Sequence, residues 1–97
     1  MNKILVIDDD HAINELVKIN LELDGYKVFS AFDGEEGLAL AKQEEPEVIV
    51  LDVMMPDLDG YTVAKMLREN AEMKNVPILM LTALGQLENK VKGFELG

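Results

Sequence analysis

Four short β-prone runs alternate with four stretches of helical character along the whole chain. The runs expected to be strands cover residues 3–7, 26–31, 47–51 and 76–82. The stretches expected to be helices cover about 11–24, 35–43, 60–70 and 87–96. Alternating β and α units with short connections favour right-handed crossovers and a parallel sheet with helices on both faces. We therefore expect an α/β fold in which residues 1–97 form one domain.

The first expected helix carries the clearest local signals. Asp10 is expected to cap its N-terminus, and Gly25 is suited to its C-terminal end. His11, the single histidine, is expected to be solvated at the start of the helix. Four apolar residues at helical spacing predict one apolar stripe, the pattern of a helix that packs by one face: Ile13, Leu16, Val17 and Leu21.

Composition and charge exclude several classes of protein. The chain is 48% hydrophobic and 29% charged, which is typical of a folded globular domain. It has no cysteine, which excludes disulfides and thiolate metal sites and fits a reducing compartment. A formal net charge of −10 disfavours direct binding to nucleic acid or to an anionic membrane. With no signal peptide pattern and no apolar run of about 20 residues, we expect a cytoplasmic location.

Acidic side chains follow two of the expected strands at the point where each strand ends. Asp8 and Asp9 come directly after the first, and Asp52 follows the apolar run 48–51. Thr82 ends the fourth expected strand. Because the carboxyl ends of parallel strands meet at one edge of a sheet, where ligands commonly bind, we expect these side chains to converge.

Three carboxylates brought together repel one another unless a cation lies between them. Oxygen ligands without histidine or cysteine suit Mg²⁺, which keeps positions open for water or phosphate. A carboxylate such as Asp52 can then act as nucleophile toward a phosphoryl group and form an acyl phosphate. The Thr82 hydroxyl could donate a hydrogen bond to that group after transfer.

Other interpretations of the same acids have to be weighed. Acids in loops are common turn formers, so Asp8 and Asp9 alone carry no specific signal, whereas an acid directly after a buried run, as at Asp52, is poorly explained by solvation. The stretch "VIDDDHA" also loosely resembles the nucleophile motif of haloacid-dehalogenase-type phosphatases. That resemblance would make Asp8 the nucleophile and Asp10 the acid/base, and it leaves Asp52 unexplained.

The segments "KILVIDDD", "VIVLDVMMPDLDG" and "PILMLTA" together resemble the receiver domain of two-component response regulators, over essentially the whole chain. The resemblance implies a flavodoxin-like fold with strand order 2-1-3-4-5. It implies that Asp52 accepts a phosphoryl group from a histidine kinase or phosphotransfer protein. Mg²⁺ would be held by Asp8, Asp9 and Asp52, together with the backbone carbonyl of Met54.

The same resemblance assigns further roles. Thr82 matches the family's switch hydroxyl, and Ala83 is the small neighbour that leaves room for the phosphoryl group. Pro56 and Gly60 match positions of the family's loop after the acceptor. The helical segment 13–21 is the expected kinase-docking surface. Such a domain is a phosphoacceptor switch, capable at most of self-phosphorylation and self-dephosphorylation, and not an enzyme acting on other substrates.

The chain departs from the family pattern at its C-terminal end. Receiver domains continue into a fifth strand ending in lysine and a fifth helix, whereas this sequence ends at Gly97. Lys90 and Lys92 lie in the last expected helix and do not replace that lysine. We therefore expect weakened phosphorylation and an open edge at the fourth strand. The alternative function is a receiver fragment that self-associates through this edge rather than signals.

Overall fold

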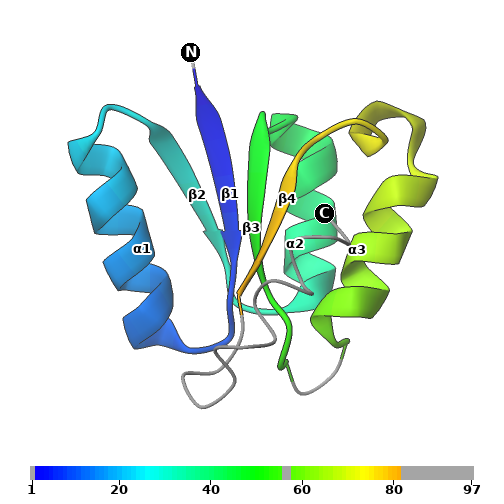
Figure 1. Ribbon diagram of the computed structural model, residues 1–97, viewed down its shortest axis with the longest axis horizontal. Coiled ribbons are helices and arrows are strands. Elements are labelled where there is room, and N and C mark those ends of the chain that lie inside the picture. The colour runs from blue at the N-terminus through cyan, green and yellow to red at the C-terminus, as the bar shows by residue number, and fades with distance from the viewer. Residues whose placement is uncertain (1, 56–57, 82–97) are drawn as a thin grey trace.

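A four-stranded parallel sheet with strand order β2-β1-β3-β4 forms the centre of the computed structural model (Figure 1), which describes residues 2–55 and 58–81. The strands are β1 (Lys3–Ile7), β2 (Lys27–Ala31), β3 (Val48–Asp52) and β4 (Ile78–Leu81). The helices are α1 (His11–Leu23), α2 (Gly34–Glu44) and α3 (Gly60–Glu69), followed by a 3₁₀ turn, η1 (Ala71–Met73). The expected flavodoxin-like α/β fold is confirmed for this part of the chain.

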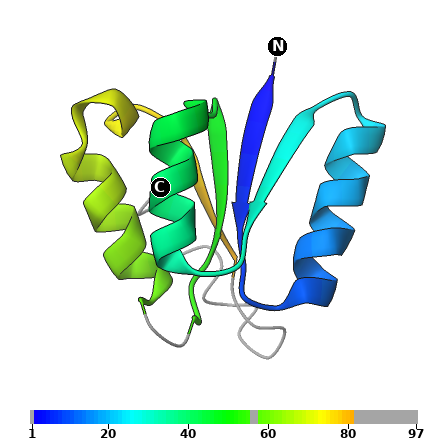
Figure 2. The same cartoon turned by 180° about the vertical axis from the view of Figure 1, so that it is seen from behind.

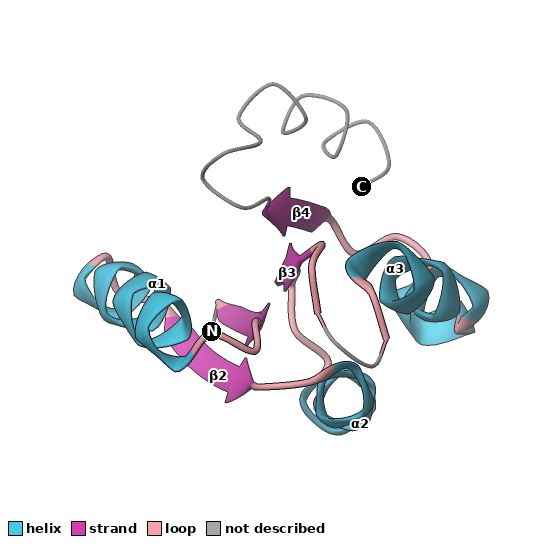
Figure 3. Cartoon of the chain, turned by 90° about the horizontal axis from the view of Figure 1, so that it is seen from below, coloured by secondary structure: helices cyan, strands magenta, loops and turns pink. Residues whose placement is uncertain are grey.

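Helices cover both faces of the sheet, as Figures 2 and 3 show: α1 packs on one face, and α2 and α3 pack on the other. Alternate strand residues therefore enter two separate cores. The larger core faces α2 and α3 and includes Leu5, Ile7, Ile49, Leu51, Ile78 and Met80. The smaller core faces α1 and includes Ile4, Val6, Val28 and Val50. Burial on both sides explains why β1 and β3 are continuous apolar runs rather than alternating ones.

The predicted apolar stripe of α1 is only partly correct. Val17 and Leu21 pack against the smaller core, but Ile13 and Leu16 are 41% and 60% exposed. The helix is rotated so that a polar residue, Asn14, takes the most buried position. Hydrogen bonds to the sheet at Asn14 decide this rotation, and a count of apolar residues cannot detect them.

In the part of the chain that the structure describes, no helix combines the length and the apolar character that a bilayer crossing requires.

The other element bounds differ from expectation by one or two residues. The fourth strand begins at Ile78 rather than at Val76, because the Val76 carbonyl accepts a 2.6 Å hydrogen bond from Arg68 Nη1 and Pro77 has no N–H to donate. Asp52 is the last residue of β3 and pairs with Leu81. The helix expected at 87–96 lies outside the described residues.

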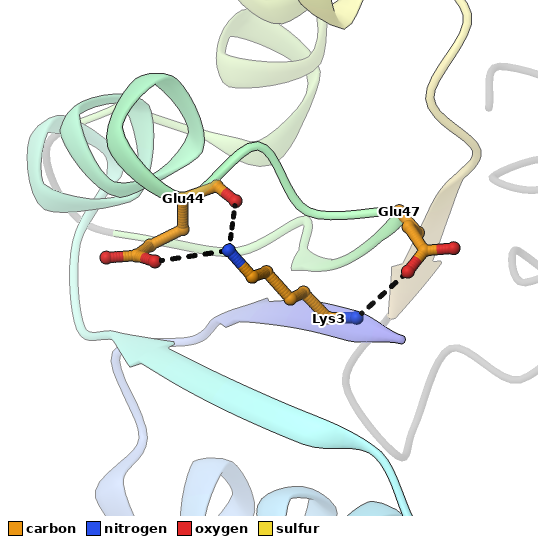
Figure 4. A network of polar contacts seen from close by, with 3 residues as sticks. All are labelled: Lys3, Glu44 and Glu47. Carbon is orange, nitrogen blue, oxygen red and sulfur yellow. Dashed lines mark hydrogen bonds and ion pairs between the residues drawn. The ribbon is translucent and has the colours of Figure 1, made fainter. Parts of the chain in front are cut away.

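A polar network closes the amino end of the sheet (Figure 4). Lys3 Nζ donates to the Glu44 carbonyl at 3.2 Å and lies 3.7 Å from the Glu44 carboxylate. The Lys3 backbone N–H donates to Glu47 Oε1 at 3.3 Å. These contacts tie β1 to the end of α2 and the start of β3. Because the Lys3 and Glu44 side chains are partly exposed, the ion pair contributes at most about 1 kcal/mol.

Close packing of α2 on β1 generates a testable prediction at Gly37. A Cβ at this position would lie 2.5 Å from Ile7 Cδ1. We expect Gly37→Ala to destabilise the chain, because overpacking costs about 1–3 kcal/mol and exceeds the helix-propensity gain of about 1 kcal/mol. Adding Ile7→Val, which removes Cδ1, should recover part of the loss. Urea unfolding of the two single variants and the double variant measures this coupling.

Ala39 provides the matched control, because it lies on the exposed side of α2. Ala39→Gly should change stability by the propensity difference alone, with no dependence on the residue at position 7. Equal effects of Gly37→Ala with and without Ile7→Val would contradict the packing explanation.

Candidate functional site

Three carboxylates meet at the carboxyl edge of the sheet. β1 and β3 are adjacent and in register at Ile7 and Leu51, so the residues that follow both strands lie side by side. One carboxylate oxygen from each of Asp8, Asp9 and Asp52 lies within 4.8 Å of the others. Asp8 is only 2% exposed, and the other two are partly buried. The structure thus brings together the three acids that the sequence placed at this edge.

Backbone hydrogen bonds hold the turn that carries Asp8. The Asp8 N–H donates to the Ala31 carbonyl of β2 at 3.0 Å, which extends the β1–β2 ladder past the last strand residue. The Asp10 N–H donates to Asp8 Oδ1 at 2.9 Å. The Asp10 side chain in turn accepts from the N–H groups of Ala12 and Ile13, as expected of an N-cap. Asp10 therefore serves α1 and orients Asp8.

The start of α3 lies close to the end of β3. Met54 N–H donates to Asp52 Oδ1 at 3.2 Å, and Gly60 N–H donates to the Val53 carbonyl at 2.8 Å. A Cβ on Gly60 would collide with the Asp52 carbonyl oxygen and with Val53 Cα. Only glycine allows α3 to begin this close to the strand end. The Met54 side chain is 54% exposed beside the site.

Crowding and burial shift the protonation of the central acids. Burial raises the pKa of Asp52 to about 7, with the charges of Asp8 and Asp9 acting in the same direction and the Met54 N–H opposing them. Burial also raises the pKa of Asp8, against the hydrogen bond from the Asp10 N–H. Near neutral pH the cluster therefore retains a proton unless another positive charge replaces it.

An aromatic contact that sequence patterns did not indicate lies at the same edge. The His11 ring stacks on Phe32, with ring centroids 4.2 Å apart and planes 13° from parallel. Phe32 directly follows β2, and its N–H donates to Glu36 Oε1 at 2.7 Å. His11 is exposed at the start of α1, as expected. Neither residue's type nor its spacing signals this pairing in the sequence.

Three residues to which the family resemblance gave a place at the site lie outside the described part of the chain: Pro56, Thr82 and Ala83. Lys90 and Lys92, which were not expected to contribute to the site, also lie outside it. The described chain does approach the acidic edge along β4, because Val53 N–H donates to the Leu81 carbonyl at 2.9 Å.

Comparison with known protein families matches residues 4–97 to the response regulator receiver domain. The chain belongs to this family. Receiver domains of this family interact with histidine kinases or phosphotransfer proteins, and they typically act as signalling switches. Asp8 and Asp9 directly after β1, and Asp52 at the end of β3, therefore lie at the carboxyl edge of the sheet of a receiver domain.

This chain is similar to two proteins named as transcriptional regulators. It is 53% identical over 97 residues to the DNA-binding dual master transcriptional regulator RpaA of Synechocystis. It is 54% identical over 95 residues to the alkaline phosphatase synthesis transcriptional regulatory protein PhoP of Bacillus subtilis. The receiver domain covers 100% and 98% of its own length in these matches but spans only 40% and 39% of the relatives.

Solved structures agree with this assignment. The chemotaxis protein CheY4 of Vibrio cholerae superimposes with a TM-score of 0.87 at 39% identity, covering 100% of this chain and 81% of CheY4. The receiver domain of the Francisella response regulator 1452 gives a TM-score of 0.83 at 41% identity, covering 100% of this chain and 78% of that one.

The raised pKa of Asp52 predicts how stability depends on pH without divalent cations. Its unfolded-state pKa is near 3.8, so between that value and about 7 the folded state binds more protons than the unfolded state. Stability is therefore highest at low pH within this window and falls as pH rises through about 7. We expect unfolding in chelator to need less urea at about pH 8 than at about pH 5.

Asp52→Asn should flatten this dependence and stabilise the chain at the higher pH, because the neutral amide avoids burying a third charge. Asp24→Asn, at the C-terminal end of α1 and outside the cluster, should keep the slope of the unmodified chain. A slope of the opposite sign, or one unchanged in Asp52→Asn, would contradict the pKa assignment.

Proposed function

We propose that this receiver domain, residues 1–97, is a phosphoacceptor module in which Asp52 receives a phosphoryl group from a phosphohistidine donor. The observation that carries the proposal is the cluster of three carboxylates within 4.8 Å, with Asp52 at the end of a buried strand. Burial and like charges make this arrangement costly without a cation between the carboxylates. Costly clusters of this kind are typical of functional sites.

The donor set fits Mg²⁺. All three groups are carboxylates, with no nitrogen or sulfur ligand in the cluster, and hard oxygen donors are those that Mg²⁺ prefers. Asp8, Asp9 and Asp52 would hold the ion, and the backbone carbonyl of Met54 completes the set that family resemblance suggests. When bound, the ion supplies the positive charge that offsets the charge of the phosphoryl oxygens during transfer.

Asp52 is the nucleophile that accepts the phosphoryl group. One of its oxygens forms the new bond to phosphorus while the bond from phosphorus to the donor's imidazole nitrogen breaks, leaving the electron pair on that nitrogen. The Met54 N–H donates to Oδ1 of Asp52 and helps to orient the carboxylate. We further propose Thr82 as the hydroxyl that contacts the phosphoryl group afterwards, with Ala83 leaving space beside it.

The proposed partner, a histidine kinase or phosphotransfer protein, would dock on α1. Leu16, Ile19 and Leu23 are spaced three and four residues apart, so they lie along one side of α1, and they are 60%, 46% and 79% exposed. This apolar strip begins one turn after the acidic loop. A cytoplasmic location, where such donors present their phosphohistidine, belongs to the same proposal.

Because two relatives are named transcriptional regulators, we propose that the phosphorylated receiver controls an attached output segment. The receiver's own charge of −10 argues against direct contact with DNA.

Phosphorylation by acetyl phosphate tests the assignment of Asp52. Incubation with Mg²⁺ should add the mass of one phosphoryl group, and the adduct should be lost in Asp52→Asn and in the absence of Mg²⁺. Asp24→Asn serves as the matched carboxylate control and should be modified as the unmodified chain is. An adduct that persists in Asp52→Asn, measured by intact mass spectrometry, would refute the assignment.

Asp52→Asn and Asp8→Asn together distinguish the phosphoacceptor function from the phosphatase alternative. That alternative requires Asp10 as acid/base, but the Asp10 carboxylate is engaged by two backbone N–H groups of α1. Turnover of a chromogenic phosphate ester that survives Asp52→Asn but not Asp8→Asn would favour the phosphatase.

A second candidate function, self-association, is favoured by the edge of the sheet. Among the described residues β4 pairs with β3 on one side only, and Leu79 on β4 is 39% exposed. An unpaired apolar strand is a template for another chain. We expect the 97-residue chain to show concentration-dependent association in sedimentation velocity, reduced by Leu79→Lys.

Leu23→Lys is the control, because Leu23 is more exposed than Leu79 but lies on α1. A monomer at every concentration, or equal effects of the two lysine substitutions, would count against association through β4.

A further inference from the structure

The most buried side chain of α1 is polar. Asn14 is 0% exposed, whereas the apolar residues Val17 and Leu21 on the same side of the helix are only partly buried. A helix that packed by apolar contact alone would place a hydrocarbon side chain at this position. The amide of Asn14 therefore has a role other than packing.

The contacts of that amide lead directly to the acidic site. Asn14 Nδ2 donates to the Asp8 carbonyl at 3.1 Å and to the Ala31 carbonyl at 2.9 Å. The Ala31 carbonyl also accepts the Asp8 N–H at 3.0 Å. The amide orientation follows from these partners, because a flipped amide would place Oδ1 against two carbonyl oxygens.

Asp8 is thus held by α1 through two separate routes. Its carboxylate accepts from the Asp10 N–H at 2.9 Å, and Asp10 caps α1. Its carbonyl accepts from Asn14, whose own N–H donates to the Asp10 carbonyl at 2.9 Å. These bonds form a closed ring through Asp8, Asp10 and Asn14, which leaves the Asp8 peptide little freedom to turn.

The remaining polar atom of Asn14 shows that this arrangement has a cost. Asn14 Oδ1 is buried and, among the described residues, has no hydrogen-bond partner. A leucine at this position would avoid that cost but could not donate to either carbonyl. The amide therefore contributes through its two hydrogen bonds, to the Asp8 carbonyl and to the Ala31 carbonyl.

We propose that Asn14 is a positioning residue of the acidic site: by fixing the Asp8 main chain to α1 and β2, its amide directs the Asp8 carboxylate toward Asp9 and Asp52. The inference rests on the proposed function in so far as the cluster binds Mg²⁺. Groups that orient metal ligands without touching the metal commonly change metal affinity by about 10-fold to 100-fold when they are removed.

Mg²⁺ affinity of Asn14→Leu and Asn14→Ala tests the proposal. The alanine variant covers the case in which the leucine variant does not fold. Titration with MgCl₂, followed by the amide NMR signals of Asp9 and Asp10, should give a dissociation constant raised about 10-fold or more in both variants. Circular dichroism establishes that each variant is folded under the titration conditions.

Two control variants isolate the effect. Asn20→Leu removes an amide on the exposed side of the same helix, where Nδ2 donates to the Leu16 carbonyl at 2.8 Å. Ser30→Ala removes a buried hydroxyl next to Ala31 that has no partner among the described residues. Both should bind Mg²⁺ within about twofold of the unmodified chain, because neither donates to Asp8.

Hydrogen exchange in the metal-free chain provides a second readout that does not depend on Mg²⁺. In the Asn14 variants the amides of Asp8 and Asp10 should lose protection about 10-fold, while that of Ile49 in β3 keeps it.

Lost protection together with weakened Mg²⁺ binding supports the proposal. Unchanged Mg²⁺ affinity in a folded Asn14 variant, or an equal loss of affinity in Asn20→Leu, overturns it. If the unmodified chain binds no Mg²⁺, the proposed function fails, and the exchange rates at Asp8 and Asp10 alone decide whether Asn14 holds this turn.

Discussion

Repulsion among the carboxylates of Asp8, Asp9 and Asp52 is the interaction around which the acidic edge is arranged. Parallel pairing of β1 with β3 brings these carboxylates together, because the two strands are buried on both faces and pair in register up to Ile7 and Leu51. Three carboxylates whose oxygens lie within 4.8 Å of one another in a partly buried site cannot all be ionised without a large electrostatic free-energy cost. Burial, with the charges of Asp8 and Asp9 acting in the same direction, raises the pKa of Asp52 to about 7, and a shared dication is the arrangement that offsets both effects.

The surrounding structure keeps the acids in place rather than letting them separate. The Asp10 N–H donates to one oxygen of Asp8, and the Met54 N–H donates to one oxygen of Asp52. Glycine at position 60 lets α3 begin close to the end of β3. At the opposite end of the sheet, Lys3 joins β1 to the end of α2. Rigid strands and short loops thus hold the carboxylates in a preorganised cluster.

Much of this arrangement follows from the sequence, because apolar runs and helical spacing determine which segments form strands and helices. The meeting of Asp8, Asp9 and Asp52 at one edge then follows from the topology of parallel sheets, whereas the strand order was implied by the resemblance to receiver domains. The buried face of α1 could not be predicted in this way, because it is decided by the hydrogen bonds of Asn14, and an asparagine within a helix carries no signal of its partners. The contact of His11 with Phe32 depends equally on tertiary placement.

Calorimetric titration of the folded chain with Mg²⁺, near neutral pH and in two buffers of different ionisation enthalpy, tests most directly whether a dication relieves the crowding. The account predicts one binding site whose occupation releases protons, with less release well above about pH 7, where Asp52 is already ionised. The account would be contradicted if the folded chain gave no heat of Mg²⁺ binding in either buffer. It would also be contradicted if Asp8→Asn and Asp52→Asn left the Mg²⁺ affinity unchanged.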